Sequence, residues 1–248
     1  MPEPALRASN LSKSFGGLVA VDRVNLDLFQ AEVHAVIGPN GAGKTTLLAM
    51  LAGDLAPSSG TIELAGHDVT RQSVEARTRS GIGRTFQRSA VIPRFAALDM
   101  VRLAALNNAG LALLSSLSAN KPATARARAA LGRVGLAERE SVAADVLSHG
   151  EKRRLEIAAV LALEPKILLL DEPLAGLGAD ESRDVVALIE GLKRDCAIML
   201  IEHDIDVVFA LADRITVLDN GRMIACGAPA EVRASEAVQQ AYLGLDQP

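Results

Sequence analysis

Aromatic side chains are scarce in this sequence, at 2% of its 248 residues, with no tryptophan, one tyrosine and five phenylalanines. The hydrophobic core must therefore be aliphatic, and an exposed phenylalanine near a functional motif is informative. Cysteine is scarce too, because only Cys196 and Cys226 are present. Their number and spacing match neither a disulfide framework nor a metal site, which fits a reducing cytosol.

Long apolar runs and an excess of positive charge are also missing. No segment reaches the roughly 18 uninterrupted apolar residues of a membrane helix. The nearest, 103–119, is broken by Asn107, Asn108 and Gly110, and we interpret it as an aliphatic helix and loop. The start, MPEPALRASN, lacks the blocks of a signal peptide. The net charge of −4 does not favour a general nucleic-acid-binding surface.

The length and an apolar fraction of 49% suit one large α/β domain, or a core with a subdomain. Residues 4–36 and 60–69 have the short alternating patterns and turns of β-strands. Continuous apolar runs in 166–173 and 197–203 predict parallel strands buried on both faces. Other segments add a crossover helix at 179–195, a hairpin at 214–227 turning at Asn220-Gly221, and one or two short helices from Pro229.

The stretch between about Gln87 and Pro165 differs from the rest of the chain. Alanine and leucine dominate it, arginine and glutamate are interspersed, and strand signals vanish. We interpret it as an inserted helical subdomain. The expected organisation is a single domain, with a core formed by 1–86 and 166–248 and a helical subdomain formed by 87–165.

A glycine-rich loop between a predicted strand and a predicted helix is the strongest functional signal. It fits the pattern G-x-x-x-x-G-K-[ST], in which inward-pointing N–H groups cradle phosphates. In that pattern the lysine reaches the β- and γ-phosphates, and the following hydroxyl binds Mg²⁺. The loop consists of Gly38, Pro39, Asn40, Gly41, Ala42, Gly43, Lys44 and Thr45.

Two acidic residues and a histidine follow the buried strands downstream. Asp171 is placed to hold Mg²⁺ through water, and Glu172 is the candidate base for the attacking water. An acidic pair after an apolar strand is usually only its polar end, but the upstream loop favours the functional interpretation. His203 follows the next strand and is expected to face the same crevice. A structural role as a hydrogen-bonding histidine stays open.

A second candidate anion site lies in LSHGE, residues 147–151. Ser148 with Glu151 three residues later forms a capping-box pattern, which begins a helix. A helix N-terminus beside Gly150, followed by Lys152, Arg153 and Arg154, favours anions. One nucleotide does not need two such sites.

These motifs in this order resemble the ATP-binding cassette (ABC) family over nearly the whole chain. The resemblance implies a P-loop NTPase fold with a mainly parallel sheet, an antiparallel β subdomain and an inserted α-helical subdomain. It makes 38–46 the Walker A motif, Gln87 the Q-loop glutamine, 147–158 the signature, 167–173 the Walker B motif and His203 the switch histidine. The implied catalytic residues are Glu172, His203, Lys44 and Gln87, and the implied Mg²⁺ ligands are Thr45, Gln87 and Asp171. ATP contacts are also implied for Val21, Thr46 and Phe15, with core packing as the alternative for Phe15.

The family's head-to-tail pairing explains the second anion site. Each ATP would lie between the P-loop of one subunit and the signature of another, so Ser148, Gly150 and Glu151 would act on a partner's nucleotide. The resemblance thus implies ATP and Mg²⁺ as cofactors, and a second ATPase subunit, identical or not, as a partner. It further implies integral membrane permease subunits, an indirectly acting substrate-binding protein, and a peripheral place on the cytoplasmic face of the membrane.

The finer resemblance is to ATPases of branched-chain amino acid importers, and it rests on the stretches SKSFGGLVAVD, GIGRTFQ, LSHGEKRRLEIA, DEPLAGL, LIEHDIDVV and EVRASEAVQQAYLG. Amino acid import is therefore expected, with urea or amide import, lipopolysaccharide export and a soluble non-transport role as alternatives. A single P-loop and the absence of heptads argue against the soluble role.

The chain departs from the family's usual residues at Gly178, which raises the alternative of a nucleotide sensor, and at Ala31. The segment 87–100, with Ile92, Phe95 and Leu98, is expected to form a groove for the membrane partner, or else to pack in the subdomain core.

Overall fold

The computed structural model describes residues 3–85, 92–106 and 120–240. The strands are β1 (Leu6–Phe15), β2 (Leu18–Leu28), β3 (Val33–Ile37), β4 (Ser59–Leu64), β5 (His67–Asp68), β6 (Ile82–Arg84), β7 (Ile167–Asp171), β8 (Ala197–Ile201), β9 (Arg214–Asp219) and β10 (Arg222–Gly227). The helices are α1 (Lys44–Ala52), α2 (Val74–Arg79), α3 (Ala97–Ala105), α4 (Lys121–Arg133), the 3₁₀ helix η4 (Ala137–Arg139), α5 (His149–Leu161), α6 (Ala179–Leu192), α7 (Ile205–Leu211), α8 (Pro229–Ala234) and α9 (Glu236–Val238).

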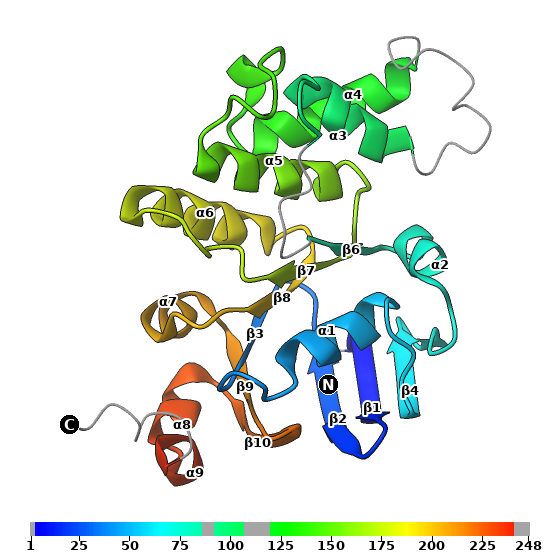
Figure 1. The fold of residues 1–248 in the computed structure, drawn as a ribbon, viewed down its shortest axis with the longest axis vertical. Helices are drawn as coiled ribbons and strands as arrows, with labels where there is room; N and C mark the ends of the chain where they lie inside the picture. The colour runs from blue at the N-terminus through cyan, green and yellow to red at the C-terminus, as the bar shows by residue number, and fades with distance from the viewer. Residues whose placement is uncertain (1–2, 86–91, 107–119, 241–248) are drawn as a thin grey trace.

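The larger sheet has the strand order β10-β9-β3-β8-β7-β6 and is parallel from β9 to β6. All residues of β3, β7 and β8 are buried, as their continuous apolar sequences predict. The expected hairpin is formed by β9 and β10. The smaller sheet, β2-β1-β4-β5, is antiparallel, and α1 packs in one apolar cluster with both sheets (Figure 1). The predicted α/β class, with a mainly parallel sheet and an antiparallel β part, is confirmed.

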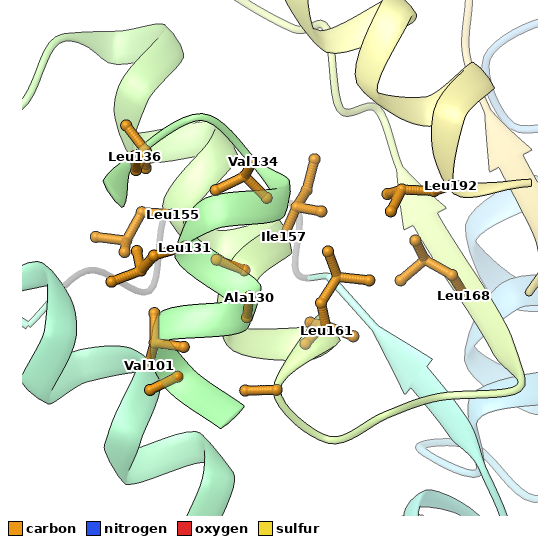
Figure 2. Packing of buried hydrophobic residues seen from close by; sticks show 14 of the residues in the cluster. Val101, Ala130, Leu131, Val134, Leu136, Leu155, Ile157, Leu161, Leu168 and Leu192 are labelled. Carbon is orange, nitrogen blue, oxygen red and sulfur yellow. The ribbon is translucent and has the colours of Figure 1, made fainter. Parts of the chain in front are cut away.

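Helices α3, α4 and α5 form a layer at one end of the molecule (Figure 1). Their apolar core continues into the large sheet, because Ile157 and Leu161 of α5 belong to one cluster with Leu168 of β7 and Leu192 of α6 (Figure 2). Helix α5 therefore packs both against α3 and α4 and against the large sheet with its helix α6. This double packing fixes where the start of α5 lies.

Three elements were not predicted from the sequence. Helices α2 and α7 have only six and seven residues, and β6 has three, too few for an alternating pattern. Strand β6 exists because it pairs in parallel with the edge of β7. Within the described parts of the chain, no helix is long and apolar enough to cross a membrane. The expected helix and loop over 107–119 lie outside the described residues.

The two departures from the family's usual residues have different backbone settings. Ala31 has a φ of +57°, in the left-handed region that glycine adopts without strain. Alanine at this turn therefore carries a small penalty, on the order of 1 kcal/mol. Gly178 has a φ of −71° and open space where a Cβ would be, so its backbone does not require glycine.

Candidate functional site

The glycine-rich loop leaves β3 and turns directly into α1. Gly43 has a φ of +99°, and a Cβ there would lie 2.4 Å from the carbonyl oxygen of Ala20, so no larger residue fits. The Nζ of Lys44 donates to the carbonyl oxygens of Gly38 at 2.6 Å and of Pro39 at 3.0 Å. Burial lowers the pKa of Lys44, while the nearby carboxylates of Glu172 and Asp171 oppose that shift. The loop thus presents a held ammonium group beside the two carboxylates.

The side chains around the loop that were predicted to contact ATP differ in exposure. Thr45 is exposed and Thr46 half-buried in the first turn of α1, where backbone N–H groups have no partner within the helix. Phe15, at the end of β1, is 50% exposed, which excludes the core-packing alternative. Val21 is instead completely buried beneath Gly43. A fully buried side chain supports the loop from below and offers no surface to a ligand.

Asp171 ends β7 and is 1% exposed. Its Oδ2 accepts a hydrogen bond from Arg84 at 3.2 Å, while its Oδ1 is buried with no hydrogen-bond partner among the described residues. Burial raises the pKa of this carboxyl group, against the opposing effect of Arg84. A buried carboxylate oxygen without a donor fits a site that binds a cation or a water held by one.

Glu172 has an unusual backbone, with a φ of +48°. Its N–H donates to the carbonyl oxygen of Ile201 at 2.9 Å, and its carbonyl oxygen accepts from Arg153 of α5 at 3.1 Å. Left-handed backbone in a non-glycine residue is strained and persists where its surroundings hold it. Here those surroundings are the neighbouring strand and the helix that begins at the LSHGE segment.

His203 follows β8, which lies between β3 and β7 in the sheet. The glycine-rich loop, His203 and the Asp171–Glu172 pair therefore leave from adjacent parallel strand ends. His203 is exposed, and the residue before it, Glu202, is buried. Glu202 accepts hydrogen bonds from the N–H groups of Leu174 at 2.8 Å and His203 at 3.2 Å. This carboxylate, which was not predicted as a site residue from the sequence, fixes the loops after both strands.

The LSHGE segment begins α5 with the predicted capping box. Glu151 N–H donates to Ser148 Oγ at 3.2 Å, and Ser148 N–H donates to the Glu151 carboxylate at 2.9 Å. Arg139 also bonds Glu151, at 3.0 Å. Because Glu151 is engaged in this way, it holds the helix start in place.

A carboxylate that was not predicted from the sequence lies on the start of α5. Glu181, in the first turn of α6, accepts hydrogen bonds from Ser148 Oγ at 3.1 Å and from Gly150 N–H at 2.9 Å. The start of α5 therefore does bind an anionic group, as its helix dipole favours. In the single subunit this anionic group is the carboxylate of Glu181.

Two further expectations concern Gln87 and the segment that was expected to form a groove for the membrane partner. Gln87 and the neighbouring residues 88–91 lie outside the described residues. In the segment expected to form a groove, Ile92 and Phe95 are half-buried, but Leu98 is only 9% exposed and belongs to the apolar core of α3, α4 and α5. Leu98 faces inward because it lies on the core-facing side of α3.

Arg153 provides a test of how α5 supports Glu172. Its guanidinium group forms a buried 3.0 Å ion pair with Glu156 in addition to its bond to the Glu172 carbonyl. We expect Arg153→Met to lower the free energy of unfolding by about 3 kcal/mol, because Glu156 is left buried without its counter-charge. Lys152→Met, a change of the same kind one residue earlier, is the control. Chemical denaturation measures both.

The double variant Arg153→Met/Glu156→Leu separates stability from positioning. Replacing both members of a buried pair by apolar residues is often neutral, so most of the lost stability should return. The ATPase activity that the family resemblance implies should be low in both the single and the double variant, because the Glu172 carbonyl lacks its donor in each. Activity that recovered together with stability would show that Arg153 matters for folding only.

Comparison with known proteins agrees with this geometry. The family model described as ABC transporter matches residues 21–175, and the model described as branched-chain amino acid ATP-binding cassette transporter matches 222–246. The chain is 38% identical over 253 residues to the high-affinity branched-chain amino acid transport ATP-binding protein LivG of Escherichia coli K12, covering 98% of this chain and 99% of LivG. It is 36% identical to BraF of Pseudomonas aeruginosa, with the same coverage, and 33% identical to the lipopolysaccharide export ATP-binding protein LptB of Escherichia coli K12, covering 97% and 98%.

Solved structures give the same result. The ADP conformation of MJ1267, an ATP-binding cassette of an ABC transporter, superposes with a TM-score of 0.88 at 27% identity, covering 97% of this chain and 98% of that one. The cbiO1 protein of Clostridium perfringens, part of an ABC transporter complex, superposes with a TM-score of 0.83 at 29% identity. The match covers 98% of this chain and 98% of cbiO1. With the P-loop, the strand-end carboxylates and the capped signature helix in place, this chain belongs to the ABC transporter family as an ATP-hydrolysing, ATP-binding subunit.

Proposed function

We propose that the chain is the energy-coupling ATPase of an importer for branched-chain amino acids. The observation that carries this proposal is the likeness to LivG and BraF over nearly the whole length, together with the branched-chain family match at 222–246. The subunit would lie on the cytoplasmic face of the membrane and act on permease subunits, with a substrate-binding protein delivering the cargo.

Lys44 is proposed to bind the phosphates of ATP, together with the N–H groups of the loop, and the exposed ring of Phe15 to stack on the adenine. Thr45, Gln87 and Asp171 would hold Mg²⁺, which neutralises phosphate charge when bound. Among the residues that the structure describes, the buried Oδ1 of Asp171 has no hydrogen-bond partner, which supports that assignment. Glu172 would accept the proton of the attacking water, and His203, at the adjacent strand end, would face the same γ-phosphate.

The second half of each ATP site is proposed to come from another subunit. Ser148 and Gly150 would donate to the γ-phosphate of the partner's ATP. The hydrogen bonds that these two groups already make to a carboxylate support the proposal, since they show an anion-binding arrangement.

The contact with the permease is proposed at the start of the helical layer. Ile92 and Phe95 remain partly exposed there, whereas the burial of Leu98 removes it from this surface. Phe95→Asp should therefore uncouple transport with little change in basal ATPase activity. Leu98→Asp should instead destabilise the fold by burying an unpaired charge. Transport and ATPase assays on the reconstituted transporter test the difference, and equal effects on both activities at Phe95 would refute the docking role.

Uptake of labelled leucine, isoleucine and valine tests the substrate class. Cells whose gene is inactivated should lose high-affinity uptake and regain it with the wild-type chain, but not with Lys44→Ala. Unchanged amino acid uptake with a loss of urea uptake, or with defective lipopolysaccharide export, would assign the subunit to one of the related systems instead.

A further inference from the structure

The carboxylate of Glu181 bridges the beginnings of two helices. Its Oε1 accepts from Ser148 Oγ and Gly150 N–H of α5, and its Oε2 accepts from Gly178 N–H at the start of α6, at 3.4 Å. Each helix start carries partial positive charge, so a carboxylate between two of them is doubly favoured. The same bonds hold the pKa of Glu181 below its usual range, with the Gly150 N–H as the main cause. Glu181 is thus bound as an anion.

The approach of Glu181 depends on the glycine in the signature. A Cβ at residue 150 would lie 2.8 Å from the Glu181 carboxyl carbon, so a larger residue would push the side chain away. The structure thus shows that an oxyanion fits in contact with both Ser148 and Gly150. These are the same two groups that the proposed function gives to the partner's γ-phosphate.

We infer that Glu181 occupies, in the separate subunit, the place of the partner's γ-phosphate, and that it must leave before the shared ATP site can form. This inference rests on the proposed action of the signature on a second subunit. Two anions cannot share one hydroxyl and one N–H without strong repulsion. Arrival of ATP therefore exchanges an internal anion for an external one. The exchange also breaks two of the bonds that tie α5 to α6, while the bond to Gly178 can remain.

The exchange makes Glu181 an inhibitor of subunit association. ATP must compete with the carboxylate, so weakening the internal contact should lower the ATP concentration at which subunits pair. Glu181→Gln removes the charge and keeps the size. Glu181→Asp keeps the charge but is one methylene too short to reach α5 while it caps α6. Asp180→Asn is the matched control, because this neighbouring carboxylate is exposed and pairs only with Arg183 among the described residues.

The test uses the hydrolysis-deficient Glu172→Gln chain with Mg²⁺ and increasing ATP, followed by sedimentation velocity. Adding Glu181→Gln or Glu181→Asp should lower the ATP concentration for half-maximal pairing by about tenfold, the value expected for a lost hydrogen bond to a charged group. Adding Asp180→Asn should leave it unchanged. ATP affinity of the separate subunits, measured at high dilution, should be the same in every variant.

The outcomes separate this inference from the proposed function. If ATP pairs the Glu172→Gln chains but both Glu181 variants need as much ATP or more, Glu181 only supports the fold and the inference is wrong. If ATP never pairs these chains, alone or mixed with the second ATPase of the same transporter, the action of the signature on a partner is itself refuted and the exchange with it.

Discussion

Glu172→Gln is expected to reduce steady-state ATP hydrolysis at least about 100-fold while leaving ATP binding intact, because the amide keeps the shape of the carboxylate but cannot accept a proton. The backbone of Glu172 supports this expectation. Its left-handed conformation is held from both sides, by Ile201 and Arg153, and these backbone bonds do not involve the side chain. The variant should therefore fold normally. Phosphate release and equilibrium binding of ATP measure the two effects separately.

The same variant should accumulate in an ATP-bound paired form that size-exclusion chromatography resolves. Glu190→Gln is a suitable control, since it makes the same change at an exposed position of α6. Hydrolysis near the wild-type rate in Glu172→Gln would show that another group accepts the proton. Loss of ATP binding would show that the charge of Glu172 acts in the ground state.

The parts of the fold that could be predicted are those with a local signal. Continuous apolar runs identify β7 and β8, the Asn220-Gly221 pair identifies the last hairpin, and Ser148 with Glu151 identifies the start of α5. In each case neighbouring residues contain the information. Strand β6 has no such signal, because its conformation comes from pairing with a strand more than 80 residues later.

The supporting residues of the site were missed for the same reason. Arg84 contacts Asp171 across 87 positions, and Glu181 contacts Gly150 across 31. Only the folded chain brings these groups together. Glu202 could have been found, since it follows an apolar strand just as Asp171 does.

Mixing two inactive variants tests whether the signature acts on a second subunit. Lys44→Ala removes the ammonium group held by Gly38 and Pro39, and Ser148→Arg places a bulky cation at the start of α5 beside Glu181. Each change disables both sites of an identical pair. In a mixed pair, one site receives both lesions while the other joins an intact P-loop to an intact signature. If the signature acts on the partner, ATPase activity should return, at well below half of the wild-type value because only some pairs are mixed.

The controls follow from the structure. Ser148→Arg also removes a helix cap, at a loss of about 1 kcal/mol, so the variant should stay folded and circular dichroism should confirm it. Pairing of identical chains should first be shown with Glu172→Gln. No recovery at any ratio, although the mixture still pairs with ATP, would mean either that the signature acts within its own chain or that both sites must be intact. Mixing each variant separately with the wild-type chain decides between these. If both sites must be intact, such mixed pairs should be inactive, whereas action within one chain should leave the wild-type member of each mixed pair active.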